Sequence, residues 1–198
     1  MTQAVHDTLS DHHFQQRRVI RRRMRDKRRQ LPAWEREEAA WRLERHLQSQ
    51  IWFARANRIG LYLPNEGELD VLPAVLGTHR RGRSLFLPVL RNRHHMSFCR
   101  WIPGEPLVEN RFGIPEPQPA RQQPVANWSL DVLLLPLVAF DAHGNRLGMG
   151  GGFYDRTLAQ LINRPRRPRL IGIGYRFQEV DALPVAPWDR RLDEVITD

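Results

Sequence analysis

The chain has 198 residues, which is enough for one domain with a sizeable buried core. Its single cysteine, Cys99, excludes an internal disulfide framework and suits a reducing compartment. The formal net charge is +9 and Lys27 is the only lysine, so arginine supplies the basic excess, which indicates an anionic partner: nucleic acid, an acidic lipid surface, or small phosphates and carboxylates.

The first quarter of the chain is expected to form an arm and two helices. Residues 1–13 are polar and lack periodicity, and the first twenty residues contain no apolar signal-peptide core. We expect a disordered N-terminal arm over 1–13 and one domain over 14–198. No glycine and only one proline, Pro32, lies between Phe14 and Gln50, which predicts an arginine-rich helix over 15–30 and a second helix over 32–50.

Short apolar runs separated by turns follow after Trp52. The expected strands cover 58–64, 81–90, 94–101, 131–140, 169–177 and 192–198. Helices are expected over 71–79, capped by Asp70, and over 157–163, and residues 103–127 form an irregular excursion. This alternation predicts an α/β fold: a single three-layer domain, a mostly parallel sheet with helices on both faces, preceded by a basic N-terminal helix.

No expected element could cross a membrane. The longest apolar run, at 132–140, contains Pro136 and is far too short to span a bilayer. We therefore expect a cytoplasmic protein with no membrane partner.

Residues 146–156 read RLGMGGGFYDR and place four glycines within five positions. A P-loop is excluded because no lysine is available, and the Rossmann fingerprint fails because position 153 is Phe. The segment follows a buried strand and leads into a helix, where backbone N–H groups can approach an anion. Arg146 could grip phosphate oxygens, and Asp155 could hold Mg²⁺. A simple flexible turn remains the alternative.

The glycine segment resembles the signature of the 5-formyltetrahydrofolate cyclo-ligase family. The stretches IGLYLPNEGELD, LFLPVL, FGIPEP and LPVAPWDRRLDEVIT resemble further blocks of that family, in the same order, so the resemblance covers about residues 17–197. It implies an ATP- and Mg²⁺-dependent conversion of 5-formyltetrahydrofolate to 5,10-methenyltetrahydrofolate with release of ADP and phosphate. The formyl oxygen would be phosphorylated, and N10 would then attack the formyl carbon.

The resemblance also implies roles for individual residues. Arg21 and Arg146 would carry the phosphoryl charge, and Asp155 and Asp189 would hold the metal. Arg17 stands where the family has lysine, and the two are not geometrically equivalent. The implied ATP contacts are Arg17, Arg21, Arg146, Gly148, Gly150, Gly151, Gly152 and Tyr154. The implied folate contacts are Leu63, Glu68, Met149, Gly150, Gly151, Gly152 and Phe153.

Three other interpretations remain open at this point. The arginine-rich helix and the net charge also fit a nucleic-acid-binding protein, although no recognised binding motif is present. A regulator that binds nucleotide or folate, or another ATP-dependent phosphotransferase, could use the same fold. We expect ATP and a reduced folate as partners, no nucleic acid, and a monomer. Glu66, Arg22, Arg23, Arg28 and Arg29 are expected to be solvated.

Overall fold

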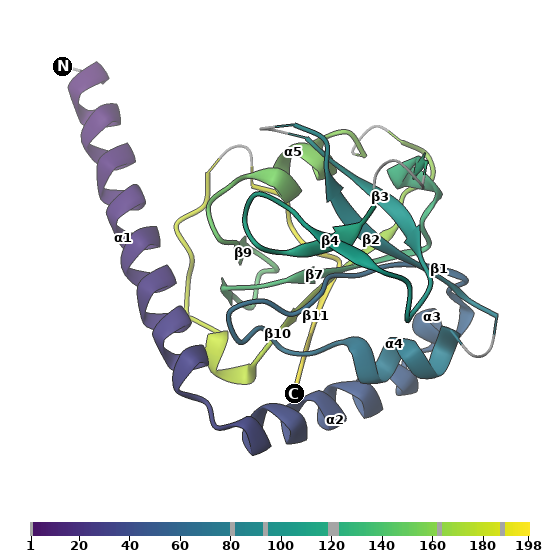
Figure 1. Ribbon diagram of the computed structural model, residues 1–198. Coiled ribbons are helices and arrows are strands. Elements are labelled where there is room, and N and C mark those ends of the chain that lie inside the picture. The colour runs from purple at the N-terminus through teal and green to yellow at the C-terminus, as the bar shows by residue number, and fades with distance from the viewer. Residues whose placement is uncertain (1, 80–81, 93–94, 119–122, 162–163, 187–188) are drawn as a thin grey trace.

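The computed structural model describes the chain except residues 1, 80–81, 93–94, 119–122, 162–163 and 187–188, and it leaves the side chains of residues 2–12 and 78–79 undescribed. Its helices are α1 (Thr2–Gln30), α2 (Ala33–Ser49), α3 (Ile51–Arg55), α4 (Leu72–His79) and α5 (Phe153–Ala159), with 3-10 turns η1 (Asn127–Ser129) and η2 (Arg176–Gln178). Figure 1 shows these helices around a central sheet.

The sheet is mixed but mostly parallel. Its strands, within the described residues, are β1 (Arg58–Gly60), β2 (Ser84–Leu90), β3 (Met96–Trp101), β6 (Pro124–Val125), β7 (Val132–Pro136), β10 (Arg169–Gly174) and β11 (Glu194–Thr197), in the order β11-β10-β7-β1-β2-β3-β6. The first five strands in this order pair in parallel, and β3 and β6 pair antiparallel. Two small hairpins accompany it, β4 (Leu107–Glu109) with β5 (Pro115–Pro117) and β8 (Ala139–Phe140) with β9 (Arg146–Leu147).

The strand order reverses between β1 and β7. The chain leaves β1 toward β2 on one side and leaves β7 toward β10 on the other, while β1 and β7 themselves are paired neighbours. In open α/β sheets the loops after two such strands diverge, and ligands bind in the crevice expected between them at the carboxyl edge. The segments 61–71 and 137–152 therefore start side by side.

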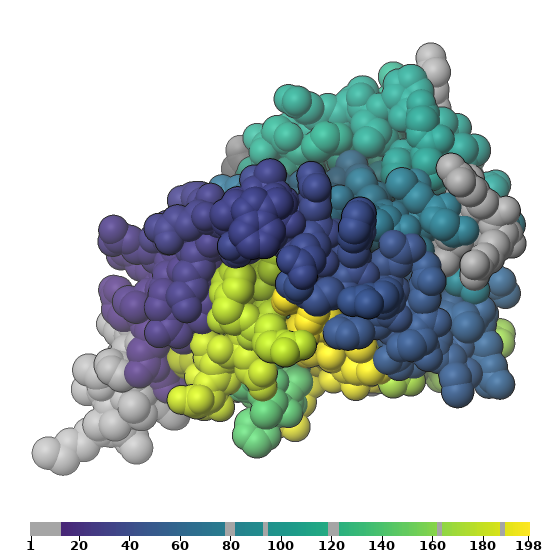
Figure 2. Space-filling model, turned by 90° about the horizontal axis from the view of Figure 1, so that it is seen from below, coloured from purple at the N-terminus to yellow at the C-terminus, as the bar shows by residue number. Residues whose placement is uncertain are grey.

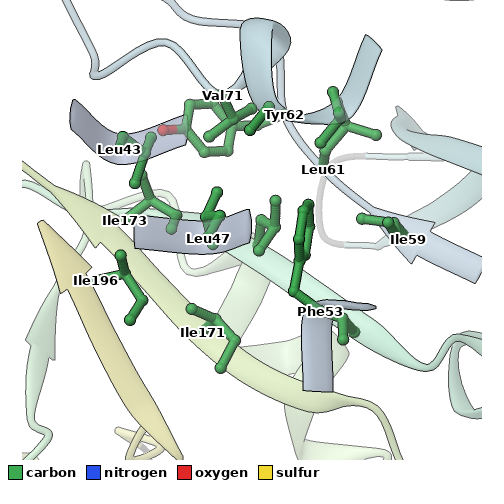
Figure 3. Close-up of a cluster of buried hydrophobic side chains, with 14 of the residues drawn as sticks. Leu43, Leu47, Phe53, Ile59, Leu61, Tyr62, Val71, Ile171, Ile173 and Ile196 are labelled. Atoms are coloured by element: carbon green, nitrogen blue, oxygen red, sulfur yellow. The ribbon is translucent and has the colours of Figure 1, made fainter. Parts of the chain in front are cut away.

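Helices cover both faces of the sheet, as the alternating pattern predicts. On one face α2, α3 and α4 contribute Leu43, Leu47, Phe53 and Val75 to a buried cluster with Ile59 and Ile171 (Figure 3). On the other face Leu158 of α5 packs in a second cluster with Leu133 and Leu135 of β7. The run 131–140 is apolar because β7 is buried from both sides, a property of central parallel strands.

The first helix differs from the expectation. It begins at Thr2, so residues 2–13 are helical, although their polar sequence without periodicity predicts a disordered arm. No glycine or proline before Pro32 would stop the helix earlier. Its second half packs on the domain through Met24, which is buried with Val138 and Leu147. Figure 1 shows the N-terminal half extending away from the domain, and Figure 2 shows α1 and α2 lying across segments near the C-terminus.

Other boundaries move for local reasons. The strand expected over 58–64 ends at Gly60, and the run 131–140 is divided into β7 and β8. Helix α5 begins at Phe153 rather than at 157, and positions 162–163 lie outside the described residues. The Asp70 cap is confirmed, because its carboxylate accepts the Leu72 N–H at 2.8 Å. Among the described residues, no helix is long and apolar enough to cross a membrane.

Candidate functional site

Helix α1 faces the loops of the crevice with one row of arginines. Arg17 and Arg21 are one turn apart, so they lie on the same face. Arg17 donates to both carboxylate oxygens of Asp189, at 3.1 Å to Oδ1, and to the Pro184 carbonyl at 3.2 Å. The Nε of Arg21 donates to the Gly148 carbonyl at 2.8 Å. The helix therefore holds the glycine segment and the C-terminal loop on the same side.

The glycine segment needs glycine at two positions at least. Gly150 has φ +101° and Gly152 has φ +67°, in the left-handed region that other residues rarely adopt. A Cβ at Gly152 would lie 2.6 Å from Nη1 of Arg156. That guanidinium also donates to the Gly151 carbonyl at 2.6 Å, and it lies over the Phe153 ring. The conformation of the loop is therefore set by these glycines and by the contacts of Arg156.

Arg146 and Asp155, at the two ends of the segment, form an ion pair with each other. Arg146 also donates to the Arg190 carbonyl, and its side chain is only 5% exposed. Burial of an arginine is costly unless its charge is paired. The pair therefore closes the glycine segment into a loop whose charged ends meet.

The turn before Arg146 is built around Asp141. This buried carboxylate accepts the backbone N–H groups of His143, Asn145 and Leu183 and the Asn145 side-chain amide, at 2.9–3.1 Å. Burial by itself raises the pKa of Asp141, but these donors outweigh it and the net pKa is lowered. Asp141 therefore fixes the approach of β9, and with it the position of Arg146.

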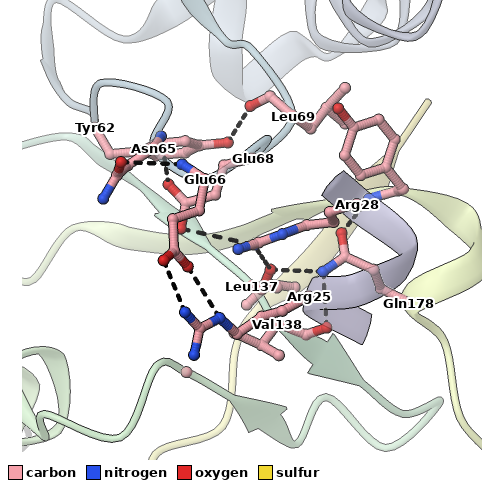
Figure 4. A network of polar contacts seen from close by, with 12 residues as sticks. Arg25, Arg28, Tyr62, Asn65, Glu66, Glu68, Leu69, Leu137, Val138 and Gln178 are labelled. Atoms are coloured by element: carbon pink, nitrogen blue, oxygen red, sulfur yellow. Dashed lines mark hydrogen bonds and ion pairs between the residues drawn. The ribbon is translucent and has the colours of Figure 1, made fainter. Parts of the chain in front are cut away.

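The loop after β1 is clamped to α1 (Figure 4). Arg25 donates from Nε and Nη2 to the two oxygens of Glu66 at 2.9 and 2.7 Å. Glu66 has φ +49°, and a Cβ at Gly67 would lie 3.1 Å from the Arg28 carbonyl, so the loop backbone rests directly on the helix. Glu66 is thus ion-paired, which corrects the expectation of a solvated acid.

Glu68 follows in the same loop and is nearly buried. Its side chain is 10% exposed, and Oε1 lies 3.7 Å from Nη1 of Arg28, whose side chain is completely buried. Burial raises the pKa of Glu68 to about 7, against the charge of Arg28 and the backbone N–H of Asn65, which lower it. The expectation that Arg28 is solvated is therefore wrong.

Arg28 is buried because of the stripe on which it lies. Ile20 and Met24 pack under the helix, and Leu31 packs on the main core, so position 28 falls on the same face. That spacing is visible in the sequence and could have identified Arg28. Arg22 and Arg29 remain half or more exposed, in line with the expectation.

Aromatic rings connect the two halves of the crevice. The pKa of Tyr154 is raised by burial and then by the nearby Glu68 carboxylate, so this α5 residue lies close to the loop after β1. Phe153 contacts Phe112 edge to face, with ring centroids 6.0 Å apart. Phe112 is 56% exposed and comes from the β4–β5 hairpin, within the stretch assigned to an irregular excursion. The FGIPEP block contained the signal for it.

The candidate residues fall into two groups. One group joins Arg17, Arg21, Arg146, the glycines, Asp155 and Asp189. The pKa of Arg21 is lowered by burial and by Arg17 and raised by both aspartates, which places these charges around it. The other group is Glu68 with Tyr154 and Phe153. Leu63 is half-buried against the main core, and Met149 is 45% exposed.

The two aspartates fit a magnesium ion as chemical donors. Mg²⁺ prefers one or two carboxylates together with waters and substrate phosphates. No group of three or more His, Cys, Asp or Glu side chains in the described part of the chain could hold a metal by itself. Asp189 accepts from Arg17 and from the Ala186 N–H, and these bonds hold its pKa below the ordinary value although burial opposes them. Asp189 is therefore held as a carboxylate, and each of the two aspartates is paired with an arginine.

Comparisons with known proteins all point to the same family. The sequence profile of the 5-formyltetrahydrofolate cyclo-ligase family matches residues 13–198. The 5-formyltetrahydrofolate cyclo-ligase of Haemophilus influenzae is 37% identical over 184 residues, which are 92% of this chain and 97% of that protein. The enzyme of the same name from Escherichia coli K12 is 36% identical over 176 residues, 88% of this chain and 96% of that one.

Solved structures agree with this. The NMR structure of Aquifex aeolicus 5,10-methenyltetrahydrofolate synthetase superposes with a TM-score of 0.77 at 30% identity, and the match covers 90% of this chain and 88% of that chain. A 5,10-methenyltetrahydrofolate synthetase from Mycoplasma pneumoniae superposes with a TM-score of 0.74 at 25% identity, covering 92% and 98%.

Proposed function

The chain belongs to the 5-formyltetrahydrofolate cyclo-ligase family, and we propose that the crevice described above is where it carries out the family's reaction. That reaction is the ATP-dependent conversion of 5-formyltetrahydrofolate to 5,10-methenyltetrahydrofolate, and the chain is a ligase of folate metabolism. The observation that carries the placement is the pairing of Arg17 with Asp189 and of Arg146 with Asp155 beside a glycine turn.

The chemistry of the reaction explains why cationic side chains and a glycine backbone suffice for catalysis. A formamide oxygen is a poor leaving group, and phosphorylation turns it into a good one that departs as N10 closes the ring. Phosphoryl transfer requires positioning and charge stabilisation more than covalent help from the protein. We propose that Arg21 and Arg146 stabilise the transferring phosphoryl charge, and that Arg17 binds the triphosphate. The glycine backbone would contact both the nucleotide and the folate.

We propose that Asp155 and Asp189 bind the magnesium ion. The ion would neutralise charge on the phosphate oxygens. Both carboxylates are ion-paired to arginines that we assign to the phosphates. Binding of the nucleotide would therefore exchange partners: each arginine turns to phosphate oxygens, and each carboxylate becomes available to the metal.

We propose that the folate lies on the Glu68 side of the glycine segment. A carboxylate accepts hydrogen bonds, and the pterin ring presents N–H donors along one edge. The exposed Phe112 packs edge to face on Phe153, and these rings offer aromatic surface for contact with the folate rings. Leu63 and Met149 complete the proposed folate contacts. We further propose a cytoplasmic monomer, in keeping with the single buried Cys99.

A spectrophotometric assay tests the function. Purified protein, ATP, Mg²⁺ and 5-formyltetrahydrofolate should together produce the near-ultraviolet absorbance band of the methenyl product, and omission of any one component should abolish it. Protein that binds ATP without forming product would instead support a regulator or a different phosphotransferase. Protein that forms no product and binds no ATP would refute the placement of the nucleotide on the glycine turn.

A further inference from the structure

The arginine row of α1 continues beyond the residues assigned to the nucleotide. Arg17 and Arg21 contact the C-terminal loop and the glycine segment. Arg25 and Arg28, nearer the C-terminal end of the same helix, contact the loop that carries Glu68. The family comparison offers no role for Arg28. Nevertheless, its side chain is fully buried. Burial of a guanidinium costs free energy unless its charge is paired and its N–H groups are hydrogen-bonded.

Arg28 is incompletely satisfied where it lies. Nη1 donates to the Leu137 carbonyl at a long 3.4 Å, and that carbonyl already accepts from Nε2 of Gln178 at 2.7 Å. Its Nε and Nη2 have no hydrogen-bond partner among the residues that the structure describes. The 3.7 Å between Nη1 and Glu68 Oε1 is an ion-pair distance but too long for a hydrogen bond. The guanidinium is thus aimed at Glu68 with spare donors.

We propose that Arg28 is a positioning residue for the folate: its buried guanidinium favours the ionised form of the Glu68 carboxylate and orients it to accept the N–H groups of the pterin edge. This inference rests on the proposed placement of the folate at Glu68. Arg28 itself does not touch the substrate.

Among the causes identified, Arg28 is the one charged side chain that favours an ionised Glu68, and Glu66 in the same loop opposes it. Tyr62 after β1 and Tyr154 of α5 also lie near the Glu68 carboxylate, and burial raises the pKa of both, so they are neutral there. Burial of Glu68 acts in the same direction as Glu66, and the Asn65 N–H is the one further group that favours the carboxylate among the causes identified. Removal of Arg28 therefore leaves Glu68 mostly protonated at neutral pH, in which form it cannot accept from both its oxygens.

The decisive experiment measures folate binding against pH in Arg28→Gln and in the wild type. Quenching of intrinsic tryptophan fluorescence by 5-formyltetrahydrofolate, without ATP, gives the Kd between pH 6 and 9. We expect Arg28→Gln to raise the Kd at least about 5-fold at pH 7, because a rise of one pKa unit lowers the ionised fraction of Glu68 from about one half to about one tenth. By pH 9 the two proteins should agree within about 2-fold.

Two further variants complete the design. Arg28→Lys keeps the charge without the planar fork and should give an intermediate shift, and it carries the test if Arg28→Gln does not fold. Arg23→Gln, exposed on the same helix, is the matched control and should leave the profile unchanged. The KM for ATP, measured in the folded variants, should stay within about 2-fold of the wild type, because the nucleotide is assigned to other residues.

The inference is overturned if the Arg28 variants bind folate with the wild-type pH profile, or if they weaken ATP and folate equally at every pH, as a purely structural role would do. Failure of the proposed function looks different. In that case the wild type itself forms no methenyl product or binds no 5-formyltetrahydrofolate, whatever stands at position 28.

Discussion

Two arginine–aspartate pairs determine how the candidate site is charged before any substrate binds. Arg146 pairs with Asp155, and Arg17 pairs with Asp189, so two of the three arginines assigned to phosphate are neutralised by carboxylates assigned to the metal. Buried or partly buried charges require such partners. The pairs keep the groups folded and oriented, and only a ligand that carries both negative phosphate and a divalent cation can replace both partners at once.

Asp155→Asn should therefore lower turnover while the protein stays folded. Asparagine can still accept from Arg146 but offers the metal no charge. A loss of about 3 kcal/mol of metal-dependent stabilisation slows the step about 100-fold. The methenyl-forming rate, measured across a Mg²⁺ titration, tests this, with Glu37→Gln on the exposed face of α2 as the control. A variant that turned over like the wild type at every Mg²⁺ concentration would refute the role of Asp155.

Among the secondary elements, the turn over 141–145 most directly determines the position of Arg146 in the site. Asp141 collects its N–H donors from the turn and from Leu183 near the C-terminus, and Gly144 has φ +77° with a Cβ position 3.2 Å from the Leu192 carbonyl. The turn connects β8 to β9, and Arg146 is the first residue of β9. A change that destabilises the turn should therefore also displace Arg146.

Asp141→Asn should reduce the free energy of unfolding by about 2 kcal/mol, because buried N–H donors lose their charged acceptor. The pKa of Asp141 is lowered in the folded chain. Its contribution is therefore fully present above the ordinary Asp pKa of about 4, and it is lost as pH falls through the lower folded value. Urea unfolding at pH 7 and at pH 3 measures this. An equal gap between variant and wild type at both pH values would contradict the assignment.

Much of this arrangement is predictable from sequence, and the exceptions have physical causes. Alternating apolar runs predicted the sheet and its two helical faces, and the i, i+4 spacing predicted that Arg17 and Arg21 share a face. The start of α1 was missed because a polar segment without periodicity can still be helical when nothing interrupts it. Glu66 was misjudged because its partner, Arg25, is remote in sequence, and a loop sequence does not encode which helix lies beneath it.

Many of the basic side chains find carboxylate partners inside the fold, although the net charge is +9. Arg25, Arg42, Arg167 and Arg169 each bind a carboxylate, as do Arg17 and Arg146 of the site. These pairs connect helices and strands within the fold. The excess positive charge has no carboxylate to neutralise it, and no recognised nucleic-acid-binding motif accompanies it.

We therefore expect the protein to pass through a column of immobilised duplex DNA at about 150 mM salt, where exposed charges separated by more than about 8 Å are screened. Retention at about 20 mM salt alone would fit non-specific attraction. Added duplex should not change the rate of methenyl formation. Elution only at high salt, with a steep dependence of affinity on salt concentration, would instead favour a nucleic-acid-binding protein.

The reach of Arg17 has a consequence for how the protein is made. Its partners, Pro184 and Asp189, lie 167 and 172 residues further along the chain. During translation the helix that carries Arg17 emerges well before Pro184 and Asp189 do. Arg17 therefore lacks these acceptors until the C-terminal loop has been made, and its contacts with that loop can form only then.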